Sequence, residues 1–218
     1  MILARIDALQ LYKMRMTFFN QIIFNTPKLS QFISRRPTLR AREKGHIVFT
    51  SGAIIVEFPS QTFNYGLLLS LGIRCRASEW QLSSLEQICT SSLPPASTLE
   101  DLYISEYRYD RPHWQEGVEN GLLWLELLRS FISVKNLYLS KEFVPRVAPA
   151  PARTCGGKND RGFFPTLKDI FLEGYQPTES LHEGIEKFVA ARRVTSHPVV
   201  VSHWDRDTDQ GMHWSPFK

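Results

Sequence analysis

The stretch "TLEDLYISEY" at residues 98–107 has two close relatives farther along the chain, and this repetition decides the fold. The relatives are "SVKNLYLSKE" at 133–142 and "TLKDIFLEGY" at 166–175. All three alternate in the manner of a β-strand, whose successive side chains point to opposite sides. We predict that one side of each strand enters the core, and these residues are Leu102, Ile104, Leu137, Leu139, Ile170 and Leu172.

A further apolar residue precedes each strand by three positions, at Leu99, Val134 and Leu167. The completed pattern, LxxLxL, is the strand segment of a leucine-rich repeat. Other segments carry it in full or in part, and they are Ile6/Leu9/Leu11, Ile47/Phe49, Leu69/Leu71/Ile73 and Val199/Val201. The recurrence predicts a stack of similar units, each of which buries its apolar side against its neighbours.

Helical patterns lie between the predicted strands. Apolar residues recur at helical spacing in residues 27–36, 80–92, 118–131 and 179–193. Because helices and strands alternate, we expect parallel strands joined by right-handed crossovers. Residues 46–73 are different, since they indicate an antiparallel strand pair that turns at residues 50–52, followed by a further strand.

These patterns predict an α/β fold, a leucine-rich-repeat-like solenoid of alternating helices and short parallel strands with an irregular N-terminal third. We expect one domain at residues 1–204 and a polar C-terminal tail at 205–218. Within the domain, the regular repeats should span about residues 80–203.

The composition is that of an ordinary soluble protein, with 43% hydrophobic and 22% charged residues in a chain of 218. No apolar run approaches the roughly 20 residues that a membrane helix needs, and no secretion signal is evident. Cys75, Cys89 and Cys155 have neither disulfide nor zinc spacing. We therefore expect an intracellular protein of the cytoplasm or nucleus, without membrane contact.

Signatures of catalysis and metal binding are missing from the sequence. There is no nucleophile motif, phosphate loop or zinc-protease motif. The acidic run at 205–211 lacks the glutamate that completes a calcium loop. His197, His203 and His213 have no accompanying cysteine and fit no zinc pattern. We therefore expect no enzyme activity, no metal and no cofactor.

A basic segment at residues 35–44 carries the largest local excess of positive charge, although the net charge of the chain is only +4. Such a cluster can bind phosphates by releasing counterions. No nucleic-acid fold signature accompanies it, so nucleic acid is an alternative partner that we do not favour.

The second side of the three strands carries an aromatic residue in each repeat, at Tyr103, Tyr138 and Phe171. Because parallel strands lie about 4.8 Å apart, these rings should form a column. Its first polar flank consists of Asp101, Asn136 and Asp169, and its second flank, on the other side, consists of Ser105, Ser140 and Glu173. Two interpretations remain open. Either the three rings and the first flank bind a partner, or the rings merely favour strand conformation or are covered by the chain's own loops.

The wording of four stretches resembles a fungal F-box/leucine-rich-repeat family. They are "TFFNQIIFNTPKLSQFISRRPTL" (17–39), "WQLSSLEQICTSSLPP" (80–95), "WLELLRSFISVKNLYLSKEFVPRVAPA" (124–150) and "GIEKFVAARRVTSHPVVVSHW" (184–204). The resemblance implies repeats that hold a protein substrate, preceded by an F-box that docks an adaptor of a cullin-type ubiquitin ligase. No segment of this chain resembles an F-box, so we expect the adaptor as a partner only if an F-box lies upstream.

The function that follows is a non-enzymatic protein-interaction module, similar to the substrate-binding repeat portion of such a ligase subunit. The alternative is a free-standing scaffold, or a degenerate fragment, without a ligase role. The identity of the protein partner is not encoded in any motif.

Overall fold

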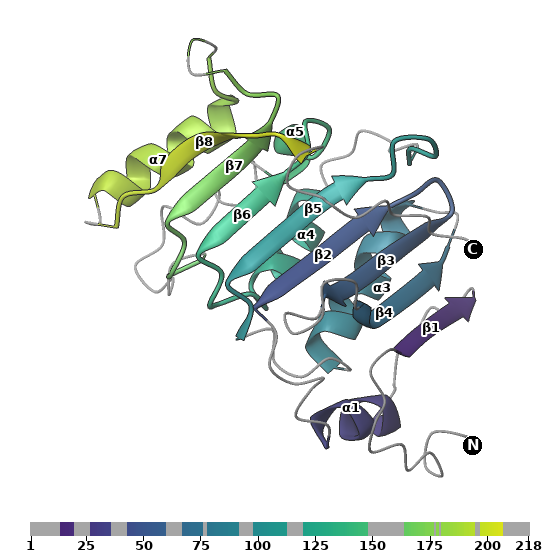
Figure 1. Ribbon diagram of the computed structural model, residues 1–218. Coiled ribbons are helices and arrows are strands. Elements are labelled where there is room, and N and C mark those ends of the chain that lie inside the picture. Colours follow the sequence, from purple (N-terminus) through teal and green to yellow (C-terminus); the bar gives the residue numbers. More distant parts are fainter. Residues whose placement is uncertain are drawn as a thin grey trace.

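The computed structural model describes residues 14–19, 27–35, 43–59, 67–75, 78–91, 98–112, 120–147, 164–176, 178, 180–194 and 197–206. This part of the chain is a mixed α/β fold with one open sheet and five helices (Figure 1). The strands are β1 Met14–Phe19, β2 Lys44–Phe49, β3 Ala53–Pro59, β4 Leu67–Arg74, β5 Asp101–Glu106, β6 Asn136–Leu139, β7 Asp169–Glu173 and β8 Val200–Trp204. The helices are α1 Pro27–Ser34, α3 Ser78–Ser91, α4 Asn120–Leu128, α5 Val144–Val147 and α7 Glu183–Val194.

The eight strands lie in the order β1-β4-β3-β2-β5-β6-β7-β8. Strands β2, β5, β6, β7 and β8 are parallel to one another, whereas β3 is antiparallel to both of its neighbours. The predicted parallel strands at β5 to β8 and the predicted antiparallel pair near the N-terminus are therefore confirmed. Strand β5 pairs with β2, however, and not with β4, the strand that precedes it in the chain.

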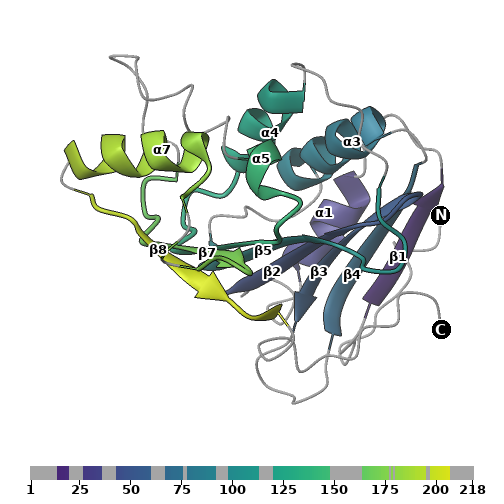
Figure 2. The ribbon, with the colours of Figure 1, turned by 90° about the horizontal axis from the view of Figure 1, so that it is seen from above.

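All five helices cover one face of the sheet, as Figure 2 shows from above. Four of them confirm the predicted helical segments, with ends that differ by a few residues. The short helix α5 and the strand β1 were not predicted. The strand expected around residues 6–11 lies outside the described residues.

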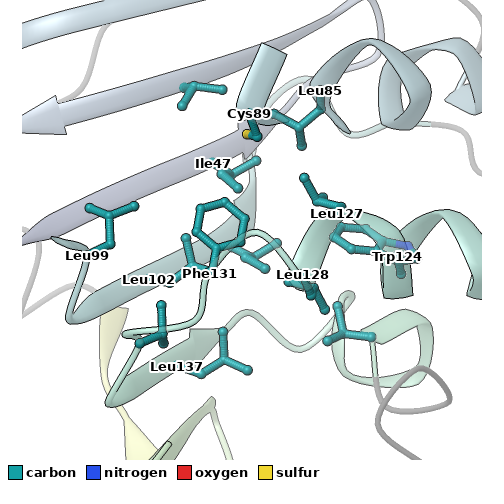
Figure 3. Packing of buried hydrophobic residues seen from close by; sticks show 14 of the residues in the cluster. Ile47, Leu85, Cys89, Leu99, Leu102, Trp124, Leu127, Leu128, Phe131 and Leu137 are labelled. Atoms are coloured by element: carbon teal, nitrogen blue, oxygen red, sulfur yellow. The ribbon is translucent and has the colours of Figure 1, made fainter. Parts of the chain in front are cut away.

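The core lies between the sheet and these helices. The predicted inward residues of β5, β6 and β7 are all buried. Figure 3 shows Leu102 and Leu137 from the sheet beside Phe131 and Leu128, which follow or belong to α4. Full burial of a side chain of this size stabilises the fold by about 1.5–3 kcal/mol. Trp124 of α4, which has no exposed surface, is among the largest side chains in this layer.

A repeated backbone contact joins each parallel strand to the next. Four carbonyl groups, which we call the junction carbonyls, accept hydrogen bonds from amides at the start of the following strand, and they belong to Glu43, Glu100, Lys135 and Lys168. The carbonyl of Glu100, for example, accepts from the amides of Lys135 and Asn136 at 2.8 and 2.9 Å. The carbonyl of Glu43 accepts from Glu100 and Asp101 at the same two distances. The regular backbone pattern therefore begins at β2, well before residue 80.

Candidate interaction surface

Four rings form a continuous column on the face of the sheet opposite the described helices, which we call the helix-free face. They belong to His46, Tyr103, Tyr138 and Phe171, which are in register on β2, β5, β6 and β7. Their centroids are 4.4, 4.0 and 4.5 Å apart in that order, and adjacent ring planes differ by 14°, 10° and 8°. The predicted stacking of the two tyrosines and the phenylalanine is confirmed, and His46 extends the stack. We call these four residues the ring column.

His46 was not predicted as a member of the column, although a signal for it was present. It directly precedes Ile47 of the Ile47/Phe49 pair, in the place that Tyr103 takes before Ile104. Burial, and then the charge of Lys44, lower the pKa of His46 from 6.5 to about 4. The imidazole is therefore neutral at physiological pH, and it stacks on Tyr103 as an uncharged ring.

The members of the column differ in exposure. Tyr103 is only 8% exposed, whereas Tyr138 and Phe171 are half-buried. Trp204, at the end of β8, lies against the two tyrosines, with its centroid 5.8 Å from that of Tyr103 and 5.7 Å from that of Tyr138. The chain thus covers part of the column itself, which was one of the two interpretations left open by the sequence.

A polar row runs beside the ring column, two residues nearer the start of each strand. Asp101, Asn136 and Asp169 are in register on β5, β6 and β7, and Lys44 occupies the equivalent position on β2. The side-chain amide of Asn136 donates to Oδ1 of Asp101 at 2.6 Å, and Nζ of Lys44 lies 3.7 Å from Oδ2 of the same carboxylate. The structure therefore brings all six predicted site residues onto one face, in two adjacent rows.

A charged cluster occupies the opposite end of the strands, at the predicted second flank of Ser105, Ser140 and Glu173. Glu106 and Arg206, which also belong to it, were not predicted as site residues. Arg206 belongs to the segment that was predicted to be a polar tail. It is nevertheless only 8% exposed, and it contacts the end of β5. Its Nη1 atom lies 3.4 Å from Oε1 of Glu106, and its Nη2 atom donates to Oγ of Ser105 at 3.3 Å. Oε2 of Glu173, on β7, lies 4.0 Å from Nη1 of Arg206. We call Ser105, Glu106 and Glu173 the acidic socket.

Two further members complete this cluster. The hydroxyl of Ser140 donates to the Glu106 carboxylate, and Arg108 pairs with Glu173 at 3.4 Å. The buried carboxylate of Glu106 therefore has both a hydroxyl donor and a guanidinium partner. Such pairing is what a buried charge requires, since an isolated one is costly.

Three features of the described side chains bear on catalysis and metal binding. Among the residues that the structure describes, no three His, Cys, Asp or Glu side chains gather where they could hold a metal ion. Burial raises the pKa of the Cys89 thiol to about 12, so this cysteine stays protonated. Ser70 is a buried serine whose hydroxyl donates to Oε1 of Glu57 at 3.0 Å. This differs from a Ser-His-Asp triad, in which the serine hydroxyl donates to a histidine imidazole.

Several sequence expectations fall on residues that the structure does not describe. These are the arginines at 36–42 of the basic segment, Cys155, His213 and residues 207–218 of the tail. In the described ranges, no helix is both long and apolar enough to cross a membrane. Comparisons with protein-family models, with curated proteins and with solved structures found no match to this chain.

Proposed function

We propose that this chain is a non-enzymatic protein-interaction module that binds a protein partner on the helix-free face of its sheet. The single observation that carries the proposal is the ring column with its polar row. We further propose that the module is a leucine-rich-repeat-like solenoid and serves as the substrate-binding repeat portion of an F-box protein, in the cytoplasm or nucleus.

The repeat interpretation is supported by agreement between side chains and backbone. The LxxLxL pattern recurs at Leu99, Val134 and Leu167, and each recurrence precedes a strand joined to its predecessor through a junction carbonyl. In a solenoid, equivalent positions of successive repeats form rows across one continuous surface. The ring column and the polar row are two such rows.

A protein partner is the occupant that this chemistry favours. Aromatic side chains carry much of the binding energy at protein interfaces, and polar groups at the rim fix the register of the partner. Tyr138 and Phe171 keep part of their surface accessible, and Asp101, Asn136 and Asp169 provide the rim. Tyr103 is covered by Trp204 in this structure, and in this state it holds the column in place.

The test is a pull-down from cell extract with the tagged full-length chain and two variants. The first variant carries Tyr138→Ser and Phe171→Ser. The matched control carries Trp80→Ser, which removes a 54% exposed aromatic ring from α3 on the opposite side of the sheet. We expect the control to retain the partners of the wild type and the column variant to lose them, with circular dichroism confirming that both are folded.

Two results would count against the proposal or refine it. Retention of every partner by a folded column variant would refute binding on this face. Co-purification of a ligase adaptor with a chain that includes any upstream F-box would support the ligase role. Capture of partners without an adaptor would instead favour the free-standing scaffold.

A further inference from the structure

The last described residues cross the same face that we propose for partner binding. Strand β8 is at the edge of the sheet, three strands away from β5. Two residues after β8 ends, Arg206 nevertheless contacts Glu106, the last residue of β5 and 100 positions earlier in the chain. Residues 204–206 therefore pass over the ends of β7 and β6 on the helix-free face. We call these three residues the W-D-R segment.

The W-D-R segment makes two separate contacts. Trp204, which is 1% exposed, packs its ring against Tyr103 and Tyr138. Arg206 enters the acidic socket, where it also donates to the backbone carbonyl of Glu106. Asp205 between them is exposed. The two contacts are made by residues only two positions apart, so one short segment joins the ring column to the acidic socket.

We propose that the helix-free face recognises a short peptide segment carrying an aromatic residue and, two positions later, an arginine, and that the W-D-R segment occupies this site in the free chain. The inference rests on the proposed function, because it names the partner's chemistry and the regulation of the same surface. The aromatic residue of the partner stacks on Tyr103 and Tyr138. Its arginine pairs with Glu106 and Glu173.

The chemistry of the acidic socket supports a guanidinium ligand. Glu106 and Glu173 present two carboxylates, and the hydroxyl of Ser105 and the carbonyl of Glu106 add two neutral acceptors. Arginine is the side chain whose planar fork of donors suits several acceptors at once. An ammonium group would meet fewer of these acceptors in a fixed geometry.

The contact made by Trp204 also carries a free-energy cost. Its indole N–H is buried and has no hydrogen-bond acceptor among the described residues. A buried donor without an acceptor is unfavourable compared with the same donor in water. Displacement of the W-D-R segment would restore that hydrogen bond, which offsets part of the stacking energy lost.

A labelled peptide of residues 202–207, SHWDRD, tests the proposal by fluorescence anisotropy. The full-length wild type is compared with a full-length variant carrying Trp204→Ala and Arg206→Gln. A tethered segment acts at an effective concentration of about millimolar, so the peptide should bind the wild type at least about tenfold more weakly than the variant. The peptide should also raise the melting temperature of the variant, because only that protein has an empty site.

Two altered peptides establish which groups are read. Replacing either Trp204 or Arg206 in the peptide, by Ala or Gln respectively, should weaken binding to the variant by about tenfold or more. A folded variant that binds none of the peptides, or binds all three equally, would overturn the proposal.

A matched control separates displacement from nonspecific effects. The full-length variant with Trp80→Ala and Arg111→Gln removes an exposed tryptophan and an exposed arginine, and it should bind the peptide as weakly as the wild type. If the double variant at 204 and 206 does not fold, Arg206→Gln alone gives the same readout. Peptide binding by that single variant no stronger than by the wild type would contradict the proposal.

These outcomes are distinguishable from failure of the proposed function. Loss of cellular partners on changing Tyr138 and Phe171, combined with no peptide binding, would leave the interaction surface standing and remove the aromatic-x-arginine chemistry. Specific peptide binding combined with partner retention by the column variant would instead place the cellular partners on another surface.

Discussion

The two halves of the sheet are built in different ways. In β5 to β8, each strand pairs with the next strand in the chain, and every pair is parallel. In β1 to β4, the spatial order is β1-β4-β3-β2. Strand β3 is antiparallel to both β4 and β2, whereas β1 is parallel to β4. The two halves meet at β2, which is antiparallel to β3 on one side and parallel to β5 on the other.

This difference shows what a parallel stack requires of its first member. Fifty-seven residues separate the junction carbonyls of Glu43 and Glu100, compared with thirty-five between Glu100 and Lys135. The hydrogen bonds at the two junctions have the same lengths nonetheless. Continuity of the sheet therefore depends on the backbone at the strand start and on the inward apolar residues, and not on the length of chain between strands.

The largest effect is expected from core residues, and it tests whether the halves respond separately. Leu137→Ala in β6 and Leu71→Ala in β4 should each cost about 2–5 kcal/mol in the free energy of unfolding, because both leave a cavity in a buried site. Chemical denaturation measures these costs. Hydrogen exchange should accelerate chiefly in β5 to β7 for Leu137→Ala, and chiefly in β1, β3 and β4 for Leu71→Ala. Equal acceleration over the whole sheet would mean that the halves form one cooperative unit.

The next effect distinguishes members of the ring column. Tyr103→Ser should cost about 2–3 kcal/mol, because Tyr103 is buried and loses contacts with His46, Tyr138 and Trp204. Phe171→Ser, at the less covered end, should cost about 1 kcal/mol. The measurement is the urea midpoint of each variant with an unchanged slope. The reverse order of costs would show that the exposed end of the column, and not its middle, contributes most to stability.

A smaller effect depends on pH and on His46. Because the pKa of His46 is about 4 in the folded chain and 6.5 ordinarily, the unfolded chain binds more protons between these values. Stability from this group is complete above pH 6.5 and falls as the pH is lowered toward 4. His46→Phe keeps a ring at this position and removes the titration. We expect the wild type to lose about 1–3 kcal/mol more than the variant between pH 7 and 4. Parallel pH profiles for the two proteins would refute this role.

The smallest effect compares a turn in each half. Gly174, after β7, has a φ of 69°, which disfavours any other residue, so Gly174→Ala should cost about 1 kcal/mol. Gly52, in the turn between β2 and β3, has ordinary backbone angles, and a Cβ there would meet nothing within 4 Å. Gly52→Ala should leave the thermal midpoint nearly unchanged. A larger loss for Gly52→Ala than for Gly174→Ala would mean that the hairpin turn needs its glycine.

Much of the fold could be predicted because its signals are local. Alternation in β5, β6 and β7, and helical spacing in α3 and α7, are each contained in a short window of sequence. The pairing of β1 with β4 and of β2 with β5 is not local, since both pairs join segments that are far apart in the chain. No short pattern specifies such a partner.

The candidate site likewise contains some residues that a local sequence pattern predicts and others that no local pattern predicts. Tyr103, Tyr138 and Phe171 could be aligned because they occupy equivalent places in similar stretches. His46 occupies that place too, but its stretch matched the repeat only in part. Arg206 could not be found, because its ion pair with Glu106 joins residues 100 positions apart and the sequence around it is that of a solvated tail.

The junction carbonyls have a consequence for how this sequence can drift. Each junction hydrogen bond uses main-chain atoms alone, and the residues that supply the carbonyls differ in charge, with glutamate at 43 and 100 and lysine at 135 and 168. Substitution at these positions leaves the acceptor in place, so selection on the fold exerts little constraint on their side chains. The ion pair between Lys135 and Glu100, at 2.5 Å, is one use made of that freedom. Recombination between units at these boundaries would likewise preserve the contact, because any residue brought to the boundary supplies a carbonyl of its own.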